Sequence, residues 1–381
     1  MSLSRSIEIL RDLVAIPSVN PGREGTTAPE ITGERRYAED VARRLGRLGV
    51  DTALVGSGER LSVVGEILTP GASETVLIAS HLDTVAVDGM VIDPFDPRIA
   101  TDRLYGRGSC DTKAGMAALL AALERVLSRG RPTRNLILVG EADEEGASLG
   151  VTDVLAHLGK RRIDWALATE PTELKIVNRH KGVVHARIAV VGRACHASRP
   201  AEGRNALVTL ARCVLALDAH AAELALVADP DLGAATLSVN QAGAGQASNI
   251  VPDAAWMVVD RRLLPNENPD EVRADIERLL RDVAGDDARI DWWQLVKPPL
   301  ERPRLPNPGH EACHEALRRS GSPALDDVAT FGTDAGLLAL HGIPSLVFGP
   351  GSIAQAHTSD EWVALEQVER ATAFFEALLR G

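Results

Sequence analysis

The feature of this sequence that most restricts its fold is an alternation of short apolar runs with longer amphipathic segments. The apolar runs include LSVVGEIL, TVLIAS, NLILVGE and WALAT. Between them lie stretches with helical spacing, such as TKAGMAALLAALERVL and VTDVLAHL. Apolar strands that alternate with helices are typical of a parallel sheet with both faces covered. We therefore expect an α/β fold, with a mostly parallel twisted sheet covered by helices.

The pattern changes after Thr169, where the predicted strands become alternately apolar and polar. These strands are VVHARIAVVG, GAATLSVNQ, AAWMVVDRRL and RIDWWQLV, with predicted helices over NALVTLARCVLAL and PDEVRADIERLL. The order strand, helix, two strands, helix, strand is that of a split βαβ, ferredoxin-like sandwich. A chain of 381 residues also suits two domains. We expect an inserted α+β domain at 178–294, and a main domain formed by 1–177 and 295–381.

Composition and charge disfavour several classes of function. The longest apolar stretches fall well short of the roughly 20 residues that cross a bilayer. The N-terminus, MSLSRSIEILRDLV, predicts an amphipathic helix and no signal peptide, so we expect a cytoplasmic protein with no membrane partner. A formal charge of -12 and a pI near 5.4 disfavour nucleic acid as a partner. The four cysteines lack paired spacing, so any metal must bind to His, Asp and Glu.

Polar side chains gather just past the predicted strands, where open α/β sheets bind their ligands. In chain order they are His81, Asp83, Asp111, Glu144, Glu145, Glu170 and His357. Two histidines and three carboxylates can hold two divalent ions if one carboxylate bridges them, and mixed nitrogen and oxygen ligands suit zinc or cobalt. Asp83 could orient His81 by accepting its second N–H. Taken singly, each residue could be an ordinary solvated side chain, but their joint occurrence at successive strand ends favours a metal site.

Six segments in order along nearly the whole chain carry a resemblance to a known family. They are HLDTV, GRGSCDTKAGMAA, EADEEGASLG, ATEP, GRACHASRP and GPGSIAQAHTSDE. These segments resemble the signature blocks of the acetylornithine deacetylase / succinyl-diaminopimelate desuccinylase family of dinuclear-zinc peptidases. The resemblance implies a zinc aminopeptidase- or carboxypeptidase-like catalytic domain that hydrolyses linear amide or peptide bonds.

The resemblance also implies two zinc ions, with cobalt as a possible substitute. His81, Asp111 and Glu170 would hold one ion, and Asp111, Glu145 and His357 would hold the other. Asp111 would therefore bridge the two ions, and a cis peptide bond would follow it. Glu144 would be the general base, which takes a proton from the attacking water and passes it to the leaving nitrogen.

The inserted domain carries further residues that the resemblance implies. His196, in CHASRP, would reach the active site of a partner subunit and stabilise the tetrahedral oxyanion, which implies a homodimer formed through this domain. On this domain, Asn249 in SNIVP and Arg262 in DRRLLP are candidates for contacts with substrate, and Asp334 in GTDAG and Gly351 are further candidates in the main domain. His196 could instead be an ordinary surface histidine, and Arg262 could form a salt bridge within the sheet.

A second motif predicts a different metal site. PGHEACHEALRR contains His310, Glu311 and His314, which match the helical zinc motif of metalloproteases. The further spaced Gly and His of metzincins are missing, and both histidines fall on the polar side of the predicted helix. With a distant acidic residue such as Asp334 as third ligand, a single-zinc protease is a remote alternative.

The substrate stays open among several amidohydrolases. GPGSIAQAHTSDEW is most similar to the acetylornithine deacetylase branch, which acts in arginine biosynthesis, whereas GTDAG departs from that branch. Succinyl-diaminopimelate desuccinylase, aminoacyl-lysine hydrolase and carboxypeptidase-like activities are alternatives, so we expect a small N-acyl amino acid or dipeptide-like substrate. A non-catalytic metal-binding protein is a further alternative, but it would not need the spare carboxylate of Glu144.

Overall fold

Two separate hydrophobic cores divide the chain into two units. The computed structural model describes residues 3–22, 28–302 and 307–381. The first unit comprises Met1–Arg179, Arg302–Asp327 and Thr333–Gly381, and the second comprises His180–Glu301 and Val328–Gly332. The short segment Val328–Gly332 belongs to the second unit, where Val328 packs against a small cluster of leucine and alanine side chains.

An eight-stranded sheet forms the centre of the first unit, in the order β1-β2-β6-β3-β7-β18-β8-β17. Its strands are β1 (Asp51–Ser57), β2 (Arg60–Ile67), β3 (Thr75–His81), β6 (Asn135–Glu141), β7 (Trp165–Ala168), β8 (Ile176–His180), β17 (Asp326–Ala329) and β18 (Ser345–Val347). The central strands β6, β3, β7 and β18 are parallel, and antiparallel pairs flank them. The expected α/β sheet with a parallel centre is confirmed.

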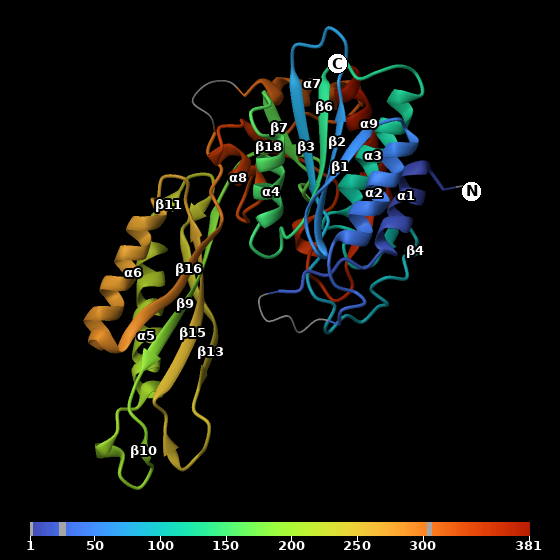
Figure 1. Ribbon diagram of the computed structural model, residues 1–381. Coiled ribbons are helices and arrows are strands. Elements are labelled where there is room, and N and C mark those ends of the chain that lie inside the picture. The colour runs from blue at the N-terminus through green and yellow to red at the C-terminus, as the bar shows by residue number, and fades with distance from the viewer. Residues whose placement is uncertain (1–2, 23–27, 303–306) are drawn as a thin grey trace. The chain divides into compact units, whose positions relative to one another are not determined.

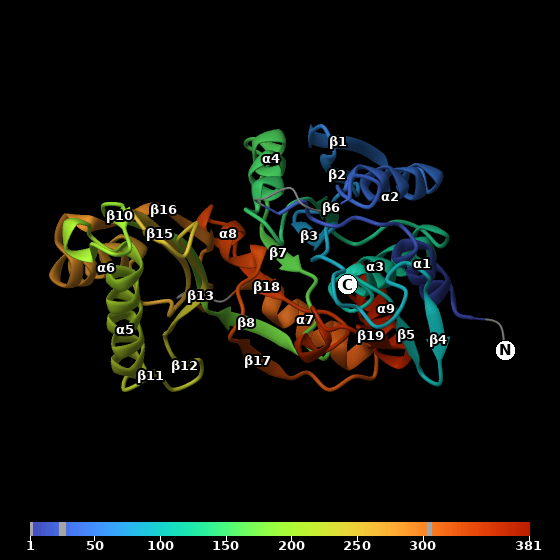
Figure 2. The same cartoon turned by 90° about the horizontal axis from the view of Figure 1, so that it is seen from below.

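Helices cover both faces of this sheet (Figures 1 and 2). They are α1 (Arg5–Val14), α2 (Arg35–Arg47), α3 (Lys113–Leu127), α4 (Leu149–Leu158), α7 (Pro308–Arg319), α8 (Asp334–Leu340) and α9 (Leu365–Arg380). Alternate strand residues face opposite sides. Val76 and Ile78 pack in the core with α1, α2, α3, α7 and α9, whereas Leu77 and Ala79 pack with α4 and α8. Among the described residues, no helix is both long and apolar enough to span a membrane.

The sequence does not predict β1, β8, β17 or helix α8, nor the small sheet of β4 (Arg98–Ala100), β5 (Arg103–Tyr105) and β19 (Trp362–Ala364). The reason is clearest for β17, whose sequence DDVA is only four residues long and half aspartate. Aspartate is depleted in strands, so this segment forms a strand only because it pairs at the edge of a larger sheet.

The second unit has the expected split βαβ arrangement. Strands β9 (Gly182–Val191), β13 (Thr236–Ala244), β15 (Ala254–Leu263) and β16 (Ala288–Lys297) form an antiparallel sheet in the order β13-β15-β9-β16. Helices α5 (Ala206–Leu224) and α6 (Pro269–Ala284) pack on one face of it (Figure 1). Two short ribbons complete the unit: β10 (Cys195–His196) with β14 (Ile250–Val251), and β11 (Ala228–Asp229) with β12 (Gly233–Ala234).

Candidate metal centre

The parallel strands of the first unit bring distant polar residues to one edge of the sheet. His81 ends β3 and lies opposite Glu141, which ends β6. The loop after β6 carries Glu144 and Glu145, and Glu170 follows β7 two residues after its end. Because β3, β6 and β7 are parallel, their carboxyl ends meet at the same edge. The first unit therefore supplies all of the residues of this site.

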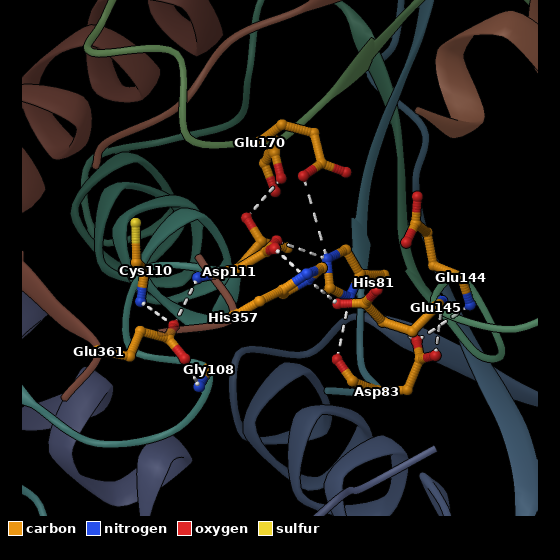
Figure 3. Close-up of polar contacts among 12 residues, drawn as sticks. His81, Asp83, Gly108, Cys110, Asp111, Glu144, Glu145, Glu170, His357 and Glu361 are labelled. Atoms are coloured by element: carbon orange, nitrogen blue, oxygen red, sulfur yellow. Dashed lines mark hydrogen bonds and ion pairs between the residues drawn. The ribbon is translucent and has the colours of Figure 1, made fainter. Parts of the chain in front are cut away.

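Asp111 lies between two histidines that are far apart in the sequence (Figure 3). Its Oδ1 is 3.0 Å from Nε2 of His81, and its Oδ2 is 3.3 Å from Nε2 of His357. His81 is buried, whereas about half of the His357 side chain is exposed, at 52%. The two oxygens of one carboxylate thus face two different imidazole rings, which is the geometry that a carboxylate bridging two cations requires.

The remaining two carboxylates stand on either side of Asp111. Glu145 Oε1 is 2.9 Å from Nε2 of His357, and Glu170 Oε2 is 4.0 Å from Nε2 of His81. Ligand atoms of His81, Asp111 and Glu145 all lie within 4.8 Å of one another. The structure therefore brings together all five residues for which the sequence predicts a role as metal ligand.

The tautomer of His81 follows from its second contact. Nδ1 lies 2.9 Å from the backbone carbonyl oxygen of Asp83. A carbonyl oxygen only accepts hydrogen bonds, so Nδ1 must carry the proton and donate it. In the neutral ring, Nε2 is then the nitrogen with a free lone pair, and it is the one that faces Asp111. His81 is therefore oriented as metal-binding histidines are.

The charges of the cluster favour a positively charged occupant. Burial raises the pKa of Asp111, but hydrogen bonds from His357 and His81 outweigh burial and hold this pKa well below its usual range. Burial lowers the pKa of His81, yet its contacts with Asp111 and nearby carboxylates raise that pKa well above its ordinary value. Two imidazoles among three carboxylates are a donor set that fits divalent ions such as zinc or cobalt.

The carboxylate of Asp83 makes different contacts from the one with His81 that the sequence spacing predicts. Its nearest carboxylate oxygen is 3.6 Å from His81 Nδ1, which is too far for a hydrogen bond of ordinary geometry. The carboxylate instead accepts the backbone N–H of Glu144 at 3.0 Å and of Glu145 at 2.8 Å, and a side-chain N–H of Asn20 at 2.7 Å. Its carbonyl orients His81, while its buried carboxylate fixes the acidic loop, and sequence spacing does not reveal this division.

A buried carboxylate that the sequence does not single out holds Asp111 in place. Glu361 accepts N–H groups of Gly108 at 2.9 Å, Cys110 at 2.9 Å and Asp111 at 3.0 Å (Figure 3). It also accepts from the guanidinium of Arg107 at 2.8 Å. Each carboxylate oxygen therefore receives two donors. Glu361 stands four residues after His357 in the same segment, but nothing in the sequence links it to a loop some 250 positions earlier.

Replacing Glu361 with Gln should weaken metal binding at the centre about 10–100-fold, the usual cost of losing a partner of a ligand. Whichever way the amide is turned, its NH₂ group would face two N–H donors and push the loop that carries Asp111 out of position. Competition with a chromogenic chelator measures this affinity. Glu366→Gln, an exposed change on α9, is the matched control. Equal affinities of Glu361→Gln and the control would contradict the role assigned to Glu361.

Two features beside Asp111 need particular backbone conformations. The peptide bond Asp111–Thr112 is cis, as the family resemblance implies. Gly351 has φ +97°, and a Cβ at this position would lie 2.5 Å from Sγ of Cys110. Its N–H donates to the side chain of Gln367 at 2.8 Å. Gly351 therefore packs against the loop that carries Asp111, and the close approach itself explains why this position is glycine.

The other residues expected to touch substrate are not part of the cluster. Asp334 begins α8 and is fully buried. His196 lies in β10 of the second unit, where Ala197 donates its N–H to the carbonyl of Asn249 at 2.9 Å. Arg262, on β15, makes a two-pronged salt bridge with Asp260, at 2.7 Å and 2.9 Å. The internal salt bridge considered as the alternative for Arg262 is thus present.

The histidines of the HEACH segment form a separate cluster. His310 and His314 on α7 face Asp326, at the start of β17, and not the buried Asp334. Glu311, the residue that would act as base in a protease, is exposed and bonded to Arg318 at 2.6 Å. The geometry therefore contradicts a single-zinc protease with Asp334 as ligand and Glu311 as base.

The sheet and the polar cluster at its edge define a candidate site for metal ions. Comparison with known sequences makes this specific: the model of peptidase family M20/M25/M40 matches residues 77–381, and the chain belongs to this family. The family resemblance noted in the sequence is thus confirmed. The family supports a hydrolase that acts on amide or peptide bonds.

Three relatives illustrate the range within the family. Acetylornithine deacetylase of Myxococcus xanthus is 29% identical over 321 residues, or 83% of this chain and 82% of that protein. Succinyl-diaminopimelate desuccinylase of Xylella fastidiosa (strain 9a5c) is 28% identical over 396 residues, or 99% of this chain and 98% of that protein. The structure of an M20 family metallo-carboxypeptidase from Sulfolobus solfataricus matches with a TM-score of 0.80 and 22% identity, and covers 99% of both chains. The fold is therefore shared along the whole chain.

Proposed function

We propose that this protein is a two-metal amidohydrolase that removes the acyl group from a small N-acyl amino acid, in the manner of an acetylornithine deacetylase. The observation that carries the proposal is the position of Asp111, whose two oxygens face the rings of His81 and His357. A single-metal site would need only one of these contacts. The similarity to an acetylornithine deacetylase along 83% of this chain supports the choice of substrate class.

The five converging residues divide into two sets of ligands that share Asp111. His81, Asp111 and Glu170 would hold one ion, and Asp111, Glu145 and His357 would hold the other. Zinc fits this mixed set of nitrogen and oxygen donors, and cobalt is a natural substitute. Divalent ions bound here would polarise the scissile carbonyl and lower the pKa of water.

Glu144 is the general base in this proposal. It stands outside both ligand sets, and Figure 3 shows its carboxylate beside the converging groups and not among them. Glu144 is buried, and its backbone N–H donates to the carboxylate of Asp83 at 3.0 Å. A carboxylate positioned in this way accepts a proton from the attacking water and returns it to the leaving nitrogen, the two transfers that amide hydrolysis requires.

The second unit would complete the site in a homodimer. Ser198 donates its backbone N–H to Nδ1 of the exposed His196 at 3.1 Å, so the ring proton of the neutral imidazole lies on Nε2. This tautomer offers an N–H donor on an exposed side chain, which suits stabilisation of an oxyanion in a partner subunit. Asn249, adjoining the same ribbon, and Arg262 would contact substrate, with Arg262 exchanging Asp260 for a substrate carboxylate. Asp334 and Gly351 of the first unit are the remaining candidates.

A panel of substrates tests the function. Zinc-loaded protein is assayed with Nα-acetylornithine, other N-acetyl amino acids, N-succinyl-diaminopimelate and unmodified dipeptides, each with and without a chelator. We expect kcat/KM to be highest for an N-acetyl amino acid, to vanish on chelation and to return with zinc or cobalt. Highest kcat/KM for the succinylated substrate or for dipeptides would replace the deacetylase assignment by that alternative. Activity that survives complete removal of metal would refute the two-metal mechanism.

A further inference from the structure

A second set of potential metal ligands lies on α7 and β17, outside the centre at His81. Nε2 of His310 is 2.9 Å from Oδ1 and 3.1 Å from Oδ2 of Asp326. Nε2 of His314 is 2.7 Å from the same Oδ1. Two imidazole nitrogens thus converge on one carboxylate, and the proposed hydrolysis gives this convergence no role.

The fold builds this cluster from one helix and one strand. Asn307 caps α7 by accepting the N–H of Gly309 at 2.9 Å, and Pro308 occupies the first turn. Cys313 is among the residues that face the core, and His310 and His314, four positions apart, lie next to each other along one margin of that buried face. The two rings lie with centroids 4.3 Å apart and planes tilted by 40°.

The neighbouring charges are paired elsewhere. Arg318 bonds with Glu311 at 2.6 Å and with Glu315 at 3.0 Å, and Lys175 bonds with Asp327 at 2.8 Å. Among the described residues, the side-chain partners of the Asp326 carboxylate are the two imidazoles. Each ring turns its Nε2 toward this carboxylate. A cation would use these two nitrogens and one oxygen of the carboxylate as its ligands.

We propose that His310, His314 and Asp326 bind a divalent zinc ion that clamps α7 to the edge strand β17. Two imidazole nitrogens and one carboxylate oxygen are protein ligands that zinc accepts, with water in the fourth position. Side-chain exposures of 33% for His310, 17% for His314 and 40% for Asp326 leave room for that water and for exchange with solvent. The clamp holds an edge strand that the sequence itself encodes only weakly.

This site is separate from the proposed active centre. In the sheet order, β17 is four strands away from β3, which ends in His81. At about 4.8 Å per strand this is roughly 19 Å. None of the three residues belongs to the other set of ligands, so the two sites can fill and empty independently. Zinc in the α7–β17 site would act on stability and not on turnover.

Titration of the metal-free full chain with zinc chloride, followed by calorimetry and by metal content after dialysis, tests the inference. Mutating a residue that only hydrogen-bonds to a metal ligand weakens metal binding about 10–100-fold. Loss of a ligand itself should therefore weaken binding at least about 100-fold. His314→Ala should therefore bind one zinc ion fewer than wild type and keep its kcat/KM. Asp326→Asn, which preserves size, should show the same loss if His314→Ala folds poorly.

Two controls make the result specific. Glu311→Gln alters the same helix, and His341→Ala removes an exposed imidazole whose Nδ1 lies 2.9 Å from the carbonyl oxygen of Leu337. Both should bind as much zinc as wild type. The same variants are also compared in an Asp111→Asn background. If the α7–β17 site binds zinc, the proteins with and without His314 should still differ by one bound ion there, whether or not the active-centre proposal holds. Equal zinc stoichiometry and affinity in wild type, His314→Ala and Asp326→Asn would overturn the inference.

Discussion

Glu144→Gln should abolish turnover while the protein keeps its full complement of metal. The substitution preserves the size of the side chain and the backbone N–H that Asp83 holds, but an amide cannot accept the proton of the attacking water. General acid–base catalysis contributes about 10²–10⁴-fold, so kcat should fall by that factor. The measurements are kcat on the best substrate of the panel and metal content by mass spectrometry. Appreciable activity in Glu144→Gln at full metal occupancy would exclude this residue as the base.

Glu145→Gln is the informative comparison, because it changes the adjacent residue of the same loop. Oε1 of Glu145 contacts His357, so this variant should lose metal as well as activity.

Glu144→Gln subunits also test whether His196 acts in a partner subunit. Mixed with His196→Ala subunits, they should regenerate some activity in the heterodimer, since one composite site would then carry both intact residues. No recovery after verified subunit exchange would contradict the role of His196 in a partner subunit.

The residues of the centre that could be predicted from the sequence are those whose position depends only on the end of a nearby strand. His81, Glu145 and Glu170 follow apolar runs, and parallel strands bring such positions to one edge. The strongly patterned segments behave in the same way: the strand over 254–263 and the helix over 308–319 have the bounds that their periodicity predicts. In these segments burial of one face decides the structure, and burial is visible in the spacing of apolar residues.

The parts that could not be predicted depend on contacts between distant segments. Glu361 positions Asp111 through four hydrogen bonds to residues 107–111, and no periodicity or spacing connects the two segments. The same holds for Asp326, a residue of a weak edge strand, which gives the histidines of α7 a partner that the helical motif alone does not name. Single-sequence patterns describe one segment at a time, whereas these interactions arise only once the sheet order is set.

Asp111→Asn should remove both ions of the active centre at once, whereas Glu170→Gln should remove only one. The asparagine has one carbonyl oxygen, so it cannot present an acceptor to each side as Asp111 does toward His81 and His357. Binding at 1,000 times Kd stabilises a protein by about 4 kcal/mol, so metal should raise the Tm of wild type by roughly 10 °C. Asp111→Asn should lose the part of this rise in Tm that comes from the active centre. The double variant Asp111→Asn/His314→Ala should also lose any part that comes from the α7–β17 site. Equal metal loss in Asp111→Asn and Glu170→Gln would show that Asp111 serves a single ion, and the bridging arrangement would then be wrong.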